Sequence, residues 1–264
     1  MIDLVYRDNG EVALLTLKRP PVNAFTPEGL LELTQTVRKL DRDEHVRAIV
    51  VSGDGPKFFS AGADLNAFAD ADSKVARLAA ARFGAAFEAL QNARAVVIAA
   101  INGYALGGGL ECALATDIRI AEKHAQLGLP ETAVGLLPCG CGTQTLPWLV
   151  GEGWAKRIIL TGERVDAQTA LRIGLVEEVV ETGAAREAAL RLADRVRSLS
   201  PDAVTYSKAL IHQARQGVPR HAALALERAR FVDLFDGPNQ REGVNAFLEK
   251  RAARWSTMPE EPAR

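Results

Sequence analysis

Short apolar runs alternate with longer amphipathic segments along the first two thirds of the chain. The runs lie at 12–17, 47–53, 95–101 and 117–121. Each is too short for a typical helix and too continuously apolar for a strand with one solvated face, so each predicts a strand covered on both faces. Apolar residues at helical spacing predict one helix between the first two runs and a second over roughly 72–92. This alternation indicates the α/β class.

Turn and capping residues support these elements. Asp8, Asn9 and Gly10 separate the apolar runs near residues 5 and 14, which predicts a β-hairpin. Thr26 followed by Pro27 predicts a helix N-terminus, because threonine caps free N–H groups and proline suits the first helical position.

The pattern changes after about residue 150. Short helices ending at glycine precede a brief strand, LVEEVV, and nearly everything from 184 to 254 has helical character. We expect a catalytic core over 1–197 and a helical region over 198–264. Helices in such a region must bury their apolar faces, either on the core or on another subunit.

Composition excludes several classes of protein. The chain has 264 residues, 48% of them apolar, and a net charge of −1, so it carries no basic surplus for nucleic acid. The most apolar segment, 95–115, is interrupted by polar residues and glycines, which argues against a membrane span. Three cysteines give no disulfide framework, and the N-terminus resembles a strand more than a targeting peptide. We therefore expect a cytoplasmic protein.

The triplet Gly107–Gly109 runs directly into Leu110 and Glu111. One interpretation is a tight turn in which glycine permits close packing. The other is a helix N-terminus whose free N–H groups face an anion. Neither a dinucleotide fingerprint nor a phosphate-binding loop fits, because no G-x-G-x-x-G and no Gly-Lys-Ser/Thr follows.

Two acids lie in apolar, glycine-lined segments. Glu111 follows the triplet, and Glu131 follows Pro130. Each by itself has an ordinary structural explanation, a solvated helix edge or an acid at the start of a helical turn. Together they indicate two carboxyls facing one cavity, where they can divide acid and base roles. The loop 58–65 can supply further N–H groups, although a surface turn capped by Asp64 is the alternative.

Other catalytic schemes fit poorly. No serine lies in a G-x-S-x-G motif, and Cys139 and Cys141 lack the partners that a zinc site requires. Packing is the expected role of both cysteines. The four histidines, His45, His124, His212 and His221, are scattered among surface-like neighbours and are interpreted as solvated.

Longer stretches resemble one known family. KFFSAGADL at 57–65, AAINGYALGGGLECALATDIRIA at 99–121 and LGLPETAVGLLPCGCGTQTL at 127–146 are similar to segments of the enoyl-CoA hydratase/isomerase (crotonase) family. RPPVNAFTPEGL at 19–30 and REGVNAFLEKR at 241–251 resemble its first active-site segment and its C-terminal signature. The likeness covers essentially the whole chain, in order.

The resemblance implies a crotonase-like spiral ββα core with a C-terminal helical trimerisation region. It implies a homotrimer or homohexamer, usually a dimer of trimers, that acts on acyl-CoA thioesters in fatty acid metabolism. Coenzyme A is then part of the substrate, and neither a metal nor another cofactor is implied.

The resemblance also implies roles for individual residues. Ala63 and Gly108 match the two amide donors of an oxyanion hole, and Glu111 and Glu131 match the catalytic acids of hydratases. The implied substrate-binding residues are Ala61, Ala63, Asp64, Leu65, Asn66, Gly108, Cys139 and Lys250.

Departures from the family pattern favour hydration. Dienoyl-CoA isomerases carry a further acid where this chain has Cys139, and simple double-bond isomerases usually keep only the acid that matches Glu131. The expected reaction is therefore reversible addition of water to a trans-2-enoyl-CoA. Double-bond isomerisation and non-catalytic acyl-CoA binding are the alternatives. Cys139 and Cys141 replace small residues of the family beside the acyl pocket.

Overall fold

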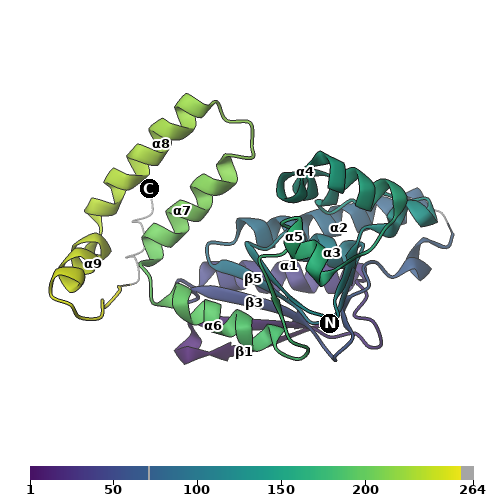
Figure 1. Ribbon diagram of the computed structural model, residues 1–264, viewed down its shortest axis with the longest axis horizontal. Coiled ribbons are helices and arrows are strands. Elements are labelled where there is room, and N and C mark those ends of the chain that lie inside the picture. The colour runs from purple at the N-terminus through teal and green to yellow at the C-terminus, as the bar shows by residue number, and fades with distance from the viewer. Residues whose placement is uncertain (71, 257–264) are drawn as a thin grey trace.

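A six-stranded sheet forms the centre of the computed structural model, which describes residues 1–70 and 72–256 (Figure 1). Its strands, in spatial order, are β1 (Ile2–Arg7), β2 (Val12–Leu17), β3 (Ala48–Gly53), β5 (Val96–Ile101), β7 (Ile118–Glu122) and β10 (Glu178–Val180). β1 and β2 form the predicted antiparallel hairpin, and the remaining neighbours pair in parallel. Every residue of β2, β3 and β5 is buried, which confirms strands covered on both faces.

A second, smaller sheet was not predicted. Its strands, in spatial order, are β4 (Phe58–Ser60), β6 (Tyr104–Leu106), β8 (Gln126–Gly128) and β9 (Val165–Asp166). Strands of two or three residues are too short to show an apolar period. β4, β6 and β8 run parallel to one another, and each follows a strand of the large sheet after a short connection. The chain thus passes three times from the large sheet to the small sheet and on toward a helix, which is the repeating ββα arrangement of a spiral.

Helices cover both faces of the large sheet (Figure 1). On one face lie α1 (Pro27–Arg42) and α2 (Ser73–Asn92), which pack against each other. Thr26 caps α1 as predicted, because its hydroxyl accepts a hydrogen bond from the N–H of Gly29 at 3.1 Å. α6 (Ala185–Arg197) covers the other face, and its buried residues are alanines, which allow the helix to lie close to the strands.

Short helices follow the small sheet. α3 (Gly108–Leu114) is entirely buried, and α4 (Gly142–Thr161) is broken at Gly151, whose φ of 77° and ψ of 161° are not helical. The segment AKRIILTG at 155–162, one of the short helices expected to end at glycine, is the second half of α4. α5 is Ala167–Arg172, and single 3₁₀ turns lie at Asp8–Gly10, Leu65–Phe68, Pro130–Val134 and Leu234–Asp236.

The C-terminal helices extend away from the sheets (Figure 1). They are α7 (Pro201–Gln213), α8 (Arg220–Asp233) and α9 (Pro238–Leu248). No residue of α8 is buried, and Phe247 on α9 is 83% exposed. This confirms that the region is helical, while the division of the chain at 197/198 stays a prediction.

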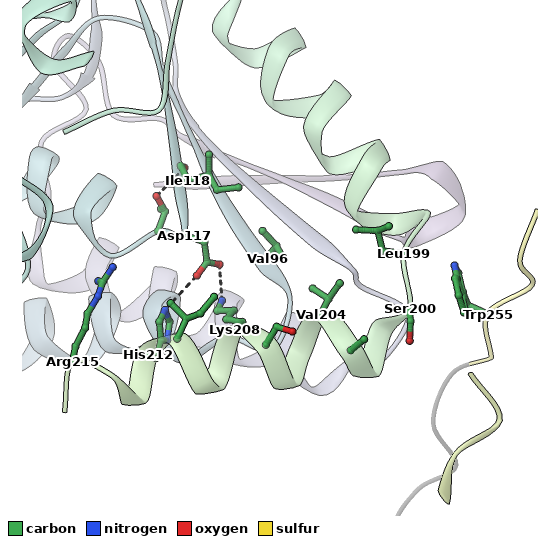
Figure 2. Close-up of a pocket in the computed structure, with 14 residues that line it drawn as sticks. Val96, Asp117, Ile118, Leu199, Ser200, Val204, Lys208, His212, Arg215 and Trp255 are labelled. Atoms are coloured by element: carbon green, nitrogen blue, oxygen red, sulfur yellow. Dashed lines mark hydrogen bonds and ion pairs between the residues drawn. The ribbon is translucent and has the colours of Figure 1, made fainter. Parts of the chain in front are cut away.

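An ionic cluster anchors α7 to the core. Lys208 Nζ lies 2.7 Å from Asp117 Oδ2 and donates to the carbonyl of Ala95 at 2.8 Å, and His212 Nε2 lies 3.4 Å from Asp117 Oδ1. Figure 2 shows the side chains of Lys208 and His212 pointing from α7 toward this carboxylate. The interpretation of His212 as solvated is wrong, since its side chain is only 16% exposed.

Within the described ranges, no helix combines the length with the apolar character that crossing a membrane would require.

Candidate active site

Both predicted acids line one cavity of about 430 Å³. The cavity lies between α2, the start of α3 and the segment that connects β8 to α4. Its lining residues are Ala63, Phe68, Ala76, Ala79, Ala80, Phe83, Gly108, Glu111, Glu131, Gly135, Leu136, Leu137 and Cys139. Four of the residues singled out from the sequence, two acids and two candidate amide donors, therefore meet at one place.

Glu111 is held by the backbone of another segment. It lies on α3, is 2% exposed, and its Oε1 accepts hydrogen bonds from three consecutive N–H groups. These belong to Gly140 at 2.9 Å, Cys141 at 2.9 Å and Gly142 at 2.8 Å, at the start of α4. Three amide donors and the positive end of a helix stabilise a negative carboxylate. Because all three bonds go to Oε1, Oε2 is the oxygen that is left for a ligand in the cavity.

Glu131 has a different environment. It lies on the 3₁₀ turn Pro130–Val134, and its Oε2 is buried without a hydrogen-bond partner among the described residues. Burial, and secondarily the charge of Glu111, raise the pKa of Glu131 to about 7. Glu131 can therefore hold a proton near neutral pH, whereas Glu111 is held in place by three backbone amides.

The first candidate amide donor is the N–H of Gly108. Gly107 precedes it with a φ of 54°, a conformation that glycine adopts without strain, and α3 begins at the next residue. A methyl group at Gly107 would also lie 3.1 Å from Glu131 Oε1. As the first residue of a helix, Gly108 has an N–H without an intrahelical acceptor.

The second candidate donor is the N–H of Ala63. Phe25 forms a parallel bridge around this residue, donating to the carbonyl of Gly62 at 2.7 Å and accepting from the N–H of Asp64 at 2.9 Å. In such a bridge the N–H of the central residue points away from the partner strand. A methyl group at Gly62 would lie 3.0 Å from the nitrogen of Gly108, so the segments that carry the two donors are in contact.

The two cysteines near the acids differ in position. Cys139 lines the cavity, and burial together with both carboxylates raises the pKa of its thiol to about 11. Cys141 donates from Sγ to the carbonyl of Glu111 at 3.3 Å, and burial raises its pKa to about 12. Both thiols are therefore neutral at physiological pH, and Cys141 contributes a hydrogen bond beyond the packing expected from the sequence.

The other predicted substrate-binding residues lie outside this cavity in the single chain. Asp64 caps the 3₁₀ turn that contains Leu65 and Asn66, and it pairs with Arg19 at 2.6 Å, while Ala61 precedes the turn on the same loop. Lys250 follows α9, which lies at the far end of the molecule from α3 (Figure 1). The structure does not bring Lys250 to the acids within one chain.

The apolar wall of the cavity was missed in the sequence. Positions 76, 79, 80 and 83 lie on one face of α2 at helical spacing and all line the cavity. Phe83 also packs edge-to-face against Phe25 and Phe87. The helical period that predicted α2 contained this face, but nothing local showed what it would contact.

A larger cavity of about 620 Å³ lies between α7 and the first residues of β5 and β7 (Figure 2). Asp117, Lys208 and His212 of the ionic cluster are among its lining residues. These groups are paired with one another and with backbone atoms, so their role is to anchor α7. The smaller cavity is the candidate active site, because a carboxylate oxygen in it has no partner in the described part of the chain.

Comparison with known proteins agrees with this geometry. The family model described as enoyl-CoA hydratase/isomerase matches residues 7–258. The short-chain-enoyl-CoA hydratase of Clostridium acetobutylicum is 37% identical over 94% of this chain and 95% of that protein. The 2,3-dehydroadipyl-CoA hydratase of Escherichia coli is 38% identical over 95% of this chain and 97% of that protein.

Solved structures show the same fold. Pseudomonas aeruginosa DspI is 61% identical, with a TM-score of 0.92 over 96% of both chains. An enoyl-CoA hydratase from Bacillus anthracis is 36% identical, with a TM-score of 0.93 over 97% of this chain and 99% of that chain. The predicted crotonase-like spiral core is therefore confirmed, and the chain belongs to the enoyl-CoA hydratase/isomerase family.

Proposed function

We propose that this protein is an enoyl-CoA hydratase, which reversibly adds water to a trans-2-enoyl-CoA and gives a 3-hydroxyacyl-CoA. The observation that carries the proposal is that Glu111, Glu131 and the two candidate amide donors line one largely apolar cavity. Relatives named short-chain-enoyl-CoA hydratase and crotonyl-CoA hydratase support it. Two acids suit hydration, because water must be activated at one carbon while a proton is delivered to the next.

The amides of Ala63 and Gly108 act on the thioester. They donate to its carbonyl oxygen, polarise the conjugated double bond and stabilise the enolate-like charge that forms when the nucleophile attacks C3. In enzymes where one such donor has been removed, the rate fell by roughly 10²–10³-fold. Fixed amides need no reorganisation during the reaction, so in this proposal the chemistry requires neither a metal nor a redox cofactor.

The carboxyls of Glu111 and Glu131 each carry out one of the two proton transfers. Oε2 of Glu111 accepts a proton from water as the water oxygen bonds to C3, and Glu131 delivers its proton to C2. The carboxyl pair therefore carries one proton before and after the reaction, on Glu131 first and on Glu111 afterwards. Exchange with solvent restores the starting form. The reverse reaction uses the same groups in the opposite sense.

Substrate binding and assembly belong to the same proposal. The CoA moiety lies along the loop at 63–66, which begins at the donor Ala63. A homotrimer or homohexamer in the cytoplasm would cover the exposed apolar residues of the C-terminal helices, among them Phe231, Val232, Phe235, Phe247 and Leu248. Lys250 would then act on the CoA phosphates only if assembly brings it to a neighbouring site.

Activity toward a graded series of trans-2-enoyl-CoA esters tests the proposal. Hydration removes the conjugated double bond, so the ultraviolet absorbance of the enoyl thioester is expected to fall when enzyme is added. Formation of absorbance from a 3-enoyl-CoA, without loss from a 2-enoyl-CoA, would instead identify an isomerase. Binding of the esters without either change would identify a non-catalytic protein.

The pH dependence follows from the single proton on the carboxyl pair. With the pKa of Glu131 near 7, the proton is present below that pH and lost above it. We expect kcat/KM to fall about tenfold per pH unit above roughly 7. The overall reaction releases no proton, so profiles measured from pH 5.5 to 9 should be parallel for the enoyl-CoA and the 3-hydroxyacyl-CoA. Rates that rise through pH 7 would contradict this division of roles.

A further inference from the structure

Three strands of the small sheet each lead to one part of the candidate site. β4 runs toward Ala63, β6 toward Gly108 and β8 toward Glu131. Because the three strands are parallel, their carboxyl ends lie together at the cavity and their amino ends lie together at the opposite edge. Each strand has only three residues, a length of about 10 Å, so a shift at the amino end reaches the site almost undiminished.

Strand pairing alone does not define these positions well. β4 and β6 share two paired positions with an irregular register between them, and β6 and β8 also share two. Longer ladders fix register through many repeated pairs, which this sheet does not have. The amino ends of the strands must therefore be positioned by other contacts.

The first of these contacts comes from Asn102, which lies just before β6. Its buried side chain accepts from the N–H of Gly53 at 2.9 Å and donates to the carbonyls of Gly53 at 3.1 Å and Gly55 at 2.6 Å. A longer bond reaches the carbonyl of Phe58 at 3.4 Å, where β4 begins. Asn102 thus joins the start of β6 to the loop at 53–57, which feeds β4.

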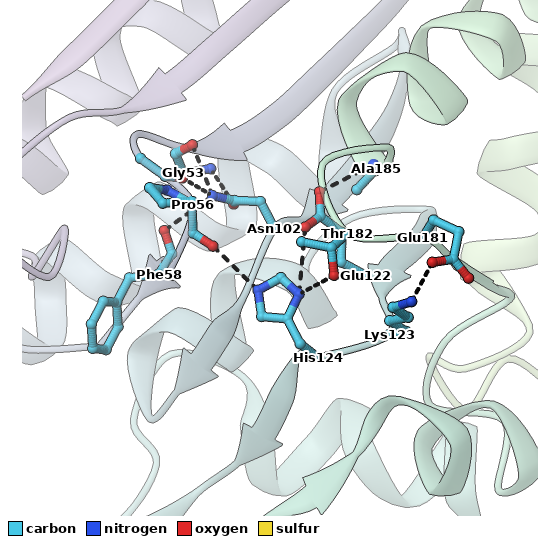
Figure 3. A network of polar contacts seen from close by, with 11 residues as sticks. Gly53, Pro56, Phe58, Asn102, Glu122, Lys123, His124, Glu181, Thr182 and Ala185 are labelled. Carbon is cyan, nitrogen blue, oxygen red and sulfur yellow. Dashed lines mark hydrogen bonds and ion pairs between the residues drawn. The ribbon is translucent and has the colours of Figure 1, made fainter.

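The second contact comes from His124, just before β8. Figure 3 shows its ring between the loop at 53–57 and the chain after β10. Nε2 lies 3.2 Å from the carbonyl of Pro56, and Nδ1 lies 3.2 Å from the hydroxyl of Thr182 and 3.6 Å from a carboxylate oxygen of buried Glu122. A carbonyl oxygen only accepts, so Nε2 carries the proton in this contact. The side chain of His124 is 33% exposed, so it is partly solvated as expected from the sequence, but it also has a bonding partner on each side.

We propose that the loop at 53–57, held by Asn102 and His124, forms a base clamp that positions the active site from the far edge of the small sheet. Through the clamp, the two side chains set the relative placement of both amide donors and of Glu131. They are positioning residues, because neither lines the cavity. The expected effects of the clamp on kcat rest on the proposed hydratase function. Its expected effects on hydrogen exchange do not.

Substitution of His124 tests the base clamp. His124→Ala removes the bond to Pro56, and we expect kcat to fall about tenfold with KM within twofold, because small misplacements of catalytic groups slow chemistry strongly. His124→Gln restores a donor that can reach the same carbonyl and is expected to recover most of the rate. Lys123→Ala is the matched control, since Lys123 lies on the same turn and pairs with Glu181 without touching the loop.

Two kinetic outcomes would overturn the proposal. One is an unchanged kcat in His124→Ala. The other is a fall in kcat that Lys123→Ala shows equally, or that His124→Gln does not relieve, because either would indicate a general loss of stability. Melting temperatures of all three variants are measured alongside the rates.

Hydrogen exchange tests the clamp without any substrate. The N–H of Tyr104 donates to Lys57 at 2.9 Å and the N–H of Gly107 donates to Gly128 at 2.9 Å, so both report on the spacing of the short strands. We expect both amides to exchange faster in His124→Ala than in the wild-type protein or in Lys123→Ala. Equal exchange in all three proteins would overturn the clamp even if hydratase activity is found. If the wild-type protein has no hydratase activity, the proposed function is overturned, and hydrogen exchange alone then tests the clamp.

Discussion

Glu131→Gln is expected to lower kcat for hydration by about 10²–10⁴-fold while KM for the enoyl-CoA stays within a few-fold, since loss of a general acid affects chemistry more than binding. The carboxyl of Glu131 is the group in the cavity whose pKa is raised to about 7, and glutamine has the same shape without a transferable proton. Steady-state rates with a short trans-2-enoyl-CoA at pH 7 measure the effect.

The melting temperature of Glu131→Gln shows whether a lower kcat comes from lost chemistry or from misfolding. In the folded protein the pKa of Glu131 is about 7, above its ordinary value of 4.5. Between these two pH values the folded protein holds the proton more tightly than the unfolded chain, so the free energy of unfolding falls as pH rises from about 4.5 to 7. Glutamine carries no charge at any of these pH values, so Glu131→Gln does not lose this free energy of unfolding. Its melting temperature at pH 8 is expected to equal or exceed that of the wild type. Glu152→Gln is the matched control, because Glu152 is exposed on α4 and pairs with Lys156 at the surface. A near-normal rate in Glu131→Gln would refute the role assigned to this acid.

Glu111→Gln is expected to have a comparable effect on kcat, about 10²–10⁴-fold, for a different reason. The carbonyl oxygen of glutamine can still accept from the three amides of Gly140, Cys141 and Gly142, so the local fold is retained. The amide NH₂ then faces the cavity in place of Oε2 and cannot take a proton from water. Circular dichroism and binding of a CoA ester should match the wild type, whereas the rate should not.

The residual activity of Glu111→Gln gives a second measurement. The charge of Glu111 contributes to the raised pKa of Glu131, so its removal is expected to move the alkaline fall in rate to lower pH. Glu163→Gln serves as the control, because that acid is paired with Arg157 at the surface. A fully active Glu111→Gln enzyme, or an unmoved pH profile, would show that the two carboxyls do not act as a pair.

Short stretches of sequence were sufficient to predict much of the secondary structure of this protein. The hairpin, the cap at Thr26, the buried strands and the helices α1, α2 and α6 to α9 follow from periodicity and turn chemistry that a few neighbouring residues contain. The family resemblance rests on quoted segments, and the comparisons confirm it. Sequence also selected Glu111 and Glu131, because acids in apolar, glycine-lined surroundings are unusual.

The tertiary structure decided how these parts meet. The small sheet is built from strands too short to show a period, and the amides that hold Glu111 lie about 30 residues beyond it in the chain. The orientation of the Ala63 N–H depends on the bridge to Phe25, and the clamp by His124 depends on a carbonyl, which no side-chain pattern reveals. Backbone donors and acceptors are the same in every residue, so where they converge is decided by how distant segments pack and not by the letters of any one of them.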